Sequence, residues 1–394
     1  MNPRILVLTL STFAFGSAAF IFAGLLEPMA RDLHVTTSVG GQLQTVYVLT
    51  SALFGPAVAF WLGQADRRKI LMTALAAGLI LNLGCAVAPN FVTLLGLRSL
   101  MGLAAGIAFP AASVAAASLV PPERRGSAVA MVMGGMTFAF LMGIPLGSVI
   151  GATFGWRATF VFAGGLMALA LAGAAAFLPS VIPPAPGQGG RVQWASFLPF
   201  YLTAFFIFAG NMTVNLYIGP ILRVGTGVTG AGVGAFQLMV GFGSFAGLFL
   251  GGRAADRGAG RTWVLAGFGA QALALGLHFA ATHHAAPQGW PSYVLAASAI
   301  FFTAVTLFAM TPVVQSMLIR QSGGAPVALA LNGSFNSVGQ AVGSMVGGAA
   351  LAIAGVPAIP AAAIGLSLIG LCVCAAIFPA SAKRQPGGLG ENAG

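Results

Sequence analysis

The sequence has 394 residues, of which 58% are hydrophobic and 6% are charged. A soluble domain carries about 25% charged residues, so the composition excludes a soluble globular protein and indicates an all-α membrane protein. The formal net charge is +11, but the basic residues lie in short loops between apolar runs, where they set membrane orientation. We therefore expect no nucleic-acid partner.

Apolar runs of about 20 residues recur along the chain, and each is long enough to cross a bilayer as a helix. The first run is long, lacks a clear cleavage site and is followed by many more runs, so we assign it as a span and not as a signal peptide. Glycine, proline and charged residues separate the runs. In chain order, the twelve predicted spans are 4–26, 41–62, 70–88, 92–118, 127–152, 158–178, 196–218, 232–252, 262–282, 293–317, 327–352 and 359–379.

The longest break between spans runs from Pro179 to Trp194 and is rich in proline and glycine, which is typical of a linker. We predict two six-helix bundles joined by this linker. The predicted boundaries are 1–178 for the N-terminal bundle, 179–195 for a cytoplasmic linker, 196–380 for the C-terminal bundle and 381–394 for a cytoplasmic tail.

The positions of lysine and arginine predict the orientation of the chain. With a cytoplasmic N-terminus, Arg31, Arg157 and Arg223 face the opposite side, Arg98 lies inside a span, and every other lysine and arginine is cytoplasmic. Positive residues concentrate in cytoplasmic loops. We therefore predict that both termini are cytoplasmic.

The two predicted halves resemble each other in sequence. Pro28 and Arg31, at the end of span 1, correspond to Pro220 and Arg223, at the end of span 7, with an offset of 192 positions. Transporters built from two six-helix halves show such repetition, with the substrate site between the halves. At offsets of 190 to 196 positions, the loop Asp66–Arg67 also matches Asp256–Arg257, and Gly143, Gly147 and Gly151 match Gly339, Gly343 and Gly347.

Four motifs carry a resemblance to a known family. They are Gly252-x-x-x-Asp256-Arg257 with Gly260-Arg261, Arg98-x-x-x-Gly102, Gly143-Ile144-Pro145-x-Gly147-x-x-x-Gly151, and Gly155-Trp156-Arg157 followed by Phe160. On these motifs the sequence resembles the major facilitator superfamily over nearly its full length. More narrowly, it resembles the twelve-span bacterial drug and sugar efflux members, which exchange substrate for protons. In one departure from the family pattern, Gly63 takes the usual aspartate position of the first loop.

The resemblance implies the major facilitator fold, a multi-pass protein of the bacterial inner membrane, and alternating access to a cavity between the halves. We expect a monomer that carries a small-molecule substrate and contacts the lipid bilayer. The three cysteines lie in apolar runs and no cluster of metal ligands stands out, so we expect no metal site. No phosphate-binding loop or nucleophile–base pair is present, so we expect no cofactor and no enzymatic activity.

Arg98 and Glu27 are predicted to couple transport to protons. An arginine inside a span either faces a cavity or extends to the lipid headgroups. Glu27 is the one acidic residue within or at the edge of a span, and the family arrangement implies that it lies near Arg98 beside the cavity. A neighbouring arginine favours the charged carboxylate, and removal of that arginine favours the protonated form. The alternative for Glu27 is an interfacial glutamate that faces water.

Polar residues within the predicted spans are the candidates for lining the substrate cavity. Asn332, Asn336 and Gln340 recur at four-residue spacing in span 11 and so share one helix face. Such amides either line a cavity or bond to a neighbouring helix. The other candidates are Asn211 and Asn215 in span 7, Gln237 in span 8, and Gln44 and Tyr47 in span 2.

Small residues at four-residue spacing allow helices to pack closely. We predict packing and hinge positions at Gly102, Gly106, Gly143, Pro145, Gly147, Gly151, Gly339, Gly343 and Gly347. The family resemblance implies a cytoplasmic gate that holds the outward-facing state closed, and the alternative is charge that only sets topology. The predicted gate residues are Asp66, Arg67, Arg68, Asp256, Arg257 and Arg261.

The leading hypothesis from the sequence is proton-coupled export of a small hydrophobic or amphipathic molecule, such as a drug or a metabolite. The alternative is efflux of a sugar or nucleoside, or uncoupled facilitated transport. The small acidic content, which is 6 aspartates and glutamates in the whole chain, allows this alternative.

Overall fold

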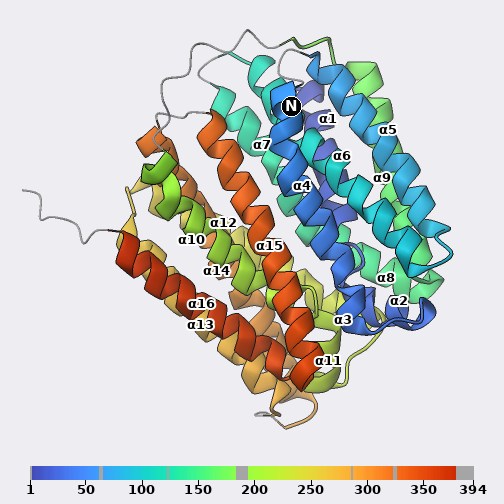
Figure 1. Cartoon of the computed structure of the whole chain (residues 1–394), viewed down its shortest axis with the longest axis vertical. Helices are drawn as coiled ribbons and strands as arrows, with labels where there is room; N and C mark the ends of the chain where they lie inside the picture. The colour runs from blue at the N-terminus through green and yellow to red at the C-terminus, as the bar shows by residue number, and fades with distance from the viewer. Residues whose placement is uncertain are drawn as a thin grey trace, which may run out of the picture.

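The computed structural model describes residues 2–61, 65–121, 124–182, 194–284, 287–322 and 326–378, and all regular secondary structure in these ranges is helical (Figure 1). Eleven helical segments in them are long and apolar enough to cross a membrane. The remaining predicted span, span 2, forms a helix of 20 residues that is not among these eleven. An all-helical membrane protein is therefore confirmed, and the twelfth span stays a prediction.

In the described residues of the first half, nine α-helices and two short segments of other helical type are defined. They are α1 (Pro3–Phe20), the 3-10 helix η1 (Ala23–Leu25), α2 (Leu26–Asp32), α3 (Thr37–Gly40), α4 (Gln42–Trp61), α5 (Arg67–Ala86), α6 (Phe91–Ser118), α7 (Arg125–Phe138), the π-helix η3 (Ala139–Gly143), α8 (Ile144–Phe154) and α9 (Trp156–Phe177).

The second half repeats this pattern, with span 11 formed by one continuous helix. The helices of this half are α10 (Trp194–Asn215), α11 (Ile218–Thr226), α12 (Ala231–Asp256), α13 (Arg261–Thr282), α14 (Trp290–Ser322), α15 (Pro326–Ala354) and α16 (Ala358–Ile377). Residues 183–193 of the predicted linker, and the whole predicted tail, lie outside the described residues.

Spans 1 and 7 are both interrupted near their outer ends, and a proline explains each interruption. Pro28 has no N–H to donate to the carbonyl of Gly24, and Pro220 has none for Leu216. The chain accordingly leaves the α-helix between Phe20 and Leu26 in the first half, and between Asn215 and Ile218 in the second. The sequence repeat at these prolines is therefore also a repeat in structure.

Close glycine contacts join spans 5 and 11 to spans 1 and 7. A Cβ atom at Gly143 would lie 2.1 Å from the Ser17 hydroxyl, and one at Gly343 would lie 2.3 Å from the Ala209 carbonyl oxygen. Only glycine allows the helices to approach so closely. The other four ladder glycines make equivalent contacts: Gly147 with Ile21, Gly151 with Leu25, Gly339 with Phe205 and Gly347 with Thr213.

A second set of glycines joins spans 2 and 4, and spans 8 and 10. Gly102 and Gly106 of α6 pack on the backbone of Tyr47 and Ser51 in α4. In the second half the glycines lie on span 8 (α12), not on span 10 (α14), and they pack against the backbone of α14. These are Gly243, Gly247 and Gly251, whose Cβ atoms would lie 2.4 to 2.6 Å from carbonyl oxygens of Phe301, Val305 and Ala309.

Pro145 coincides with a change of helix type in span 5. The five residues of η3 form a π-turn, and the N–H of Ile144 donates to the carbonyl of Ala139, five residues earlier. Pro145 cannot donate to the carbonyl of Leu141, so the regular helix is lost at this point. The wider turn faces the other half, where Gly241 of α12 packs against Leu141.

The two halves lie side by side, and the most extensive contacts between them are made by two pairs of helical segments (Figure 1). One pair is α4 with α15, and the other is α12 with the η3–α8 segment. Phe140 of η3 packs edge-on against Phe308 of α14, with ring centroids 5.6 Å apart. The short helices α2, α3 and α11 gather at the end of the molecule opposite the N-terminus, which is the predicted outer end (Figure 1).

Replacement of Gly343 by leucine is expected to disrupt the packing of α15 on α10. Since the nearest atoms belong to the α10 backbone, they cannot rotate away, and we expect a loss of about 1–3 kcal/mol or more. Thermal unfolding of the purified protein in detergent measures this loss. Gly333→Leu on the same helix is the control, because a Cβ there has no atom within 4 Å. Equal melting temperatures for the two variants would contradict the packing role.

Candidate transport site

Arg98 lies fully buried in α6 and donates hydrogen bonds to the end of α1. Its Nη1 atom is 2.8 Å from the Ala18 carbonyl oxygen, and its Nη2 atom is 3.0 Å from that of Ala19. Both carbonyls belong to the last turn of α1, where a helix leaves acceptors without backbone partners and carries partial negative charge. The interruption of span 1 thus creates the acceptors that stabilise this buried cation.

Two aromatic rings and one amide complete the surroundings of Arg98. The guanidinium carbon lies 4.7 Å from the ring centroid of Phe22 and 4.4 Å from that of Tyr47. Ring faces attract cations, and more so when water is excluded. The third hydrogen bond runs from Nη2 to the Gln44 Oε1 atom, at 3.4 Å. Arg98 therefore lies inside the protein and does not extend to the headgroups.

The predicted pair of Glu27 and Arg98 is not formed in this structure. Glu27 instead accepts hydrogen bonds from Arg223 Nε at 3.0 and 3.2 Å, and its Oε1 atom lies 2.8 Å from Arg223 Nη2. The reason is distance along span 1, because Glu27 follows the Arg98 contact at Ala19 by eight residues, or roughly 12 Å of helix. The resulting ion pair joins α2 of the first half to α11 of the second.

Other contacts close the same outer end. The Ser38 hydroxyl donates to the carbonyl of Gly348 at 2.7 Å, and a Cβ atom at Gly41 would collide with the Tyr217 hydroxyl. Only glycine therefore fits at position 41, directly before α4, where the chain passes close to Tyr217 at the start of α11. In this conformation the two halves are joined at the predicted outer end.

A small cavity lies between the halves and is lined by three of the predicted amides, Gln44, Asn215 and Gln237. Its volume is about 20 Å³, where a single water molecule requires about 10–15 Å³. The cavity therefore has room for water and not for a drug-sized molecule in this conformation. Its remaining lining residues are Phe20, Ala23, Phe140, Ile144, Met212, Leu216, Ile218 and Val240.

The amides around the cavity are linked to further polar residues. Gln237 accepts a short hydrogen bond from the hydroxyl of Ser148 in α8, which connects the two halves. On α10, Asn215 donates to the Asn211 side chain, and Asn211 in turn donates to the carbonyl of Thr303 at 3.0 Å. The cavity is thus bordered by a polar network from both halves.

The other predicted cavity residues do not line this cavity. Tyr47 packs on Arg98, and Asn211 lies behind Asn215. Asn332, Asn336 and Gln340 lie on α15, and the side-chain oxygens of Asn332 and Asn336 have no hydrogen-bond partner among the described residues.

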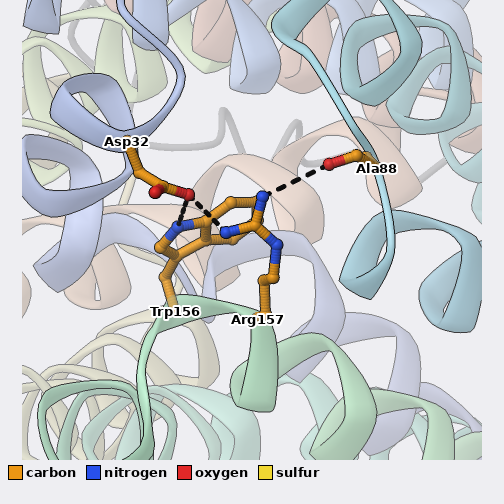
Figure 2. Close-up of polar contacts among 4 residues, drawn as sticks. All are labelled: Asp32, Ala88, Trp156 and Arg157. Atoms are coloured by element: carbon orange, nitrogen blue, oxygen red, sulfur yellow. Dashed lines mark hydrogen bonds and ion pairs between the residues drawn. The ribbon is translucent and has the colours of Figure 1, made fainter.

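Asp32 holds the turn between α8 and α9 in place at the outer end of the first half. Its carboxylate accepts hydrogen bonds from Trp156 Nε1, at 3.0 Å, and from Arg157 (Figure 2). Arg157 also lies over the Trp156 ring and donates to the carbonyl of Ala88. The Gly155-Trp156-Arg157 motif therefore ties spans 1, 3 and 6 together.

Asp66 caps α5 and binds the segment that follows α9. Burial raises the pKa of its carboxyl, but hydrogen bonds from the Val181 N–H, the Ser180 hydroxyl and the Arg68 N–H outweigh burial and hold the pKa below its ordinary value. These bonds all lie within the first half. The aspartate-to-glycine departure at Gly63 falls outside the described residues.

The corresponding loop of the second half also bonds within its own half. Arg261 donates to the carbonyls of Phe378 and Ala375 at the end of span 12, much as Arg68 donates to Ala175 at the end of span 6. Asp256 and Arg257 are exposed. The hydrogen bonds of Asp66, Arg68 and Arg261 given above do not cross between the halves, and the gate predicted for the outward-facing state stays a prediction.

The helical segments that can cross a membrane, together with a cavity between two repeated halves that carries three amides in a mostly apolar lining, define the class of protein as a membrane transporter. The chain belongs to the Major Facilitator Superfamily, whose family model matches residues 8–308. It is a multi-pass protein of the inner membrane and not an enzyme.

Known relatives support this placement along the whole chain. The inner membrane transport protein YdhP of Escherichia coli (strain K12) is 31% identical over 98% of this chain and 97% of its own. A chloramphenicol resistance protein of Streptomyces lividans is 27% identical over 86% of both chains. Among solved structures, a bacterial homologue of the human lysosomal transporter Spinster, inward-facing and occupied, has a TM-score of 0.75 at 17% identity and covers 94% of both chains.

Replacement of Asp66 by alanine is expected to destabilise the first half by about 1 kcal/mol, through loss of the helix cap and its charge. Folding lowers the pKa of the Asp66 carboxyl. The charged carboxylate therefore stabilises the folded protein at any pH above the ordinary aspartate pKa, and this stabilisation is lost as the pH falls through the pKa of Asp66 in the folded protein. The difference in melting temperature from wild type should therefore shrink below about pH 4. Asp256→Ala, the same substitution at an exposed site, is the control. Equal effects of both substitutions would argue against the cap.

Proposed function

We propose that this transporter exports a small hydrophobic or amphipathic molecule, a drug or a metabolite, by proton antiport with alternating access. The main observation behind this proposal is the ion pair of Glu27 with Arg223, which joins the two halves at the predicted outer end. Alternating access requires such a contact to break and re-form. The relative named for chloramphenicol resistance supports export as the direction. The cavity walls, which are mostly apolar with a few amides, suit an amphipathic ligand.

The proposal includes twelve spans, with α4 as the second and both termini cytoplasmic. The helix α4 has 20 residues, enough to cross the hydrocarbon core. An even number of spans places both termini on one side, and the excess of lysine and arginine favours the cytoplasm for that side.

Outward opening would require separation of the contacts at the outer end. Glu27 would then lose Arg223, and the bond between Ser38 and Gly348 would break. The contact of α12 with the π-turn of span 5 lies deeper in the molecule, where Gly241 meets Leu141. The glycine contact and the locally unwound helix make this the pivot in our proposal.

Glu27 is the proposed proton carrier. In the closed arrangement Glu27 is held in an ion pair with Arg223. On outward opening Arg223 leaves with the second half, and Glu27 faces outer water and takes up a proton. Closure restores the ion pair and expels the proton, and the small cavity begins one helical turn inward, at Ala23. That cavity is the proposed route of the proton toward the cytoplasm.

Arg98 takes part in coupling through span 1. Its bonds to Ala18 and Ala19 connect α6 to the same span that carries Glu27. Its bond to Gln44 connects it to the cavity wall. Substrate contact at Gln44 therefore acts on span 1 through Arg98, and proton binding at Glu27 acts on the same span directly.

The second candidate is efflux of a sugar or nucleoside, or uncoupled facilitated transport. The specific observation in its favour is the set of three amides around the cavity, since amides bind hydroxyl groups well. Sugar or nucleoside movement in vesicles, without response to a pH gradient, would select this candidate.

Replacement of Glu27 by glutamine is expected to abolish the response of export to a pH gradient. Glutamine keeps the shape of the side chain but binds no proton. Proteoliposomes with an imposed gradient and chloramphenicol as the probe measure the response. Wild type should export faster when the outer side is acidic, whereas the variant should export at one rate regardless of the gradient.

Asp32→Asn serves as the control, since Asp32 is another outer carboxylate but bonds only within the first half. That variant should keep the gradient response. Export that depends on neither the gradient nor Glu27 would refute the antiport mechanism and leave uncoupled transport.

A further inference from the structure

Carboxylates are kept away from the cavity in the part of the chain that the structure describes. Glu27 is bound to Arg223, and Asp32 is bound to Arg157 and Trp156. Asp66 caps α5 at the predicted cytoplasmic side, and Asp256 is exposed at the end of α12. The lining of the cavity between the halves contains no acidic residue.

A positive charge lies directly behind one wall of the same cavity. Arg98 is fully buried, and its partners in the described residues are carbonyl and amide oxygens and two ring faces, all of which are uncharged. These groups stabilise the guanidinium without neutralising it. Since charges act over longer distances in a medium of low dielectric constant, the full charge of the guanidinium contributes a positive potential to the cavity.

Gln44 connects this charge to the cavity and has its amide orientation fixed by it. The guanidinium can only donate hydrogen bonds, so the Gln44 oxygen must face Arg98. The amide nitrogen of Gln44 is buried and has no hydrogen-bond partner. An unsatisfied donor of this kind is unfavourable when buried. It therefore offers a bond to a ligand that carries an acceptor.

The opposite wall offers an acceptor, and its orientation is also fixed. Asn211 donates to the carbonyl of Thr303, which can only accept, so its own oxygen faces Asn215. Asn215 must then use its nitrogen toward Asn211, which leaves its side-chain oxygen for the cavity. The first half thus presents a donor with positive charge behind it, and the second half presents a neutral acceptor.

We propose that this cavity binds uncharged or anionic organic molecules through a carbonyl, nitro or carboxylate group placed against Gln44, and that it rejects organic cations. This proposal names the substrate class and so rests on the proposed transport function. The apolar part of the ligand would contact Phe20, Phe140 and Met212. A cation would meet the field of Arg98 with no carboxylate in the described lining to offset it.

Two dyes that share a xanthene scaffold test the proposal by charge. Fluorescein is anionic at neutral pH, and rhodamine 123 is cationic. Fluorescence anisotropy with the purified protein in detergent measures the binding of each. We expect fluorescein to bind at least about tenfold more tightly than rhodamine 123.

Gln44→Glu is the decisive variant, because it places a carboxylate beside Arg98 and neutralises the charge at the wall. The preference for fluorescein should then fall toward unity or reverse. Gln44→Met is the matched control, which removes the donor and adds no charge; it should weaken fluorescein binding while rhodamine 123 stays excluded. Asn215→Asp adds the same charge from the other half and serves if the first variant does not fold.

Equal or tighter binding of rhodamine 123 to the wild-type protein would overturn the proposal, as would the absence of fluorescein binding. Persistence of the full preference in both carboxylate variants would overturn it as well. Transport is measured separately, with fluorescein enclosed in proteoliposomes. Binding without movement would refute export and leave the charge preference standing, so the two failures are distinct.

Discussion

The hydrogen bonds between Arg98 and the open end of α1 are the interaction on which the rest of the site depends. A buried guanidinium needs acceptors, and a regular helix would have used the carbonyls of Ala18 and Ala19 itself. The interruption of span 1 before Pro28 releases them. The same interruption turns α2 toward the second half and places Glu27 against Arg223. The interruption of span 1 therefore shapes both the cavity wall and the outer closure.

The two kinds of helix contact have different roles in such a protein. Glycine ladders bring spans 1 and 5, and spans 7 and 11, together at backbone distance, so each pair behaves as a rigid unit. Between the halves, the contacts include side-chain hydrogen bonds such as those of Ser38 with Gly348 and Ser148 with Gln237. Rigid units joined by hydrogen bonds that can break and re-form are suited to rocking motion around a central cavity.

Sequence patterns predicted the features that repeat, and missed those that depend on the backbone or on distant residues. Spacing revealed the glycine ladders, and hydropathy revealed that Arg98 lies inside a span. The acceptors of Arg98 are carbonyls, which every residue has, so no side chain signals them. Glu27 was paired with Arg98 because both border the cavity; its observed partner, Arg223, is 196 positions away in the other half. Ser148 and Asp32 likewise show their roles only once the chain is folded.

The fixed positive charge beside a cavity without carboxylates in its described lining also has an electrical consequence. An anion that leaves the cell and a proton that enters it move charge in the same direction. A membrane potential that is negative inside favours each of these steps by about 2.3 kcal/mol per 100 mV. Anionic substrates would therefore be exported with help from voltage as well as from the proton gradient, whereas uncharged substrates would draw on voltage through the proton alone.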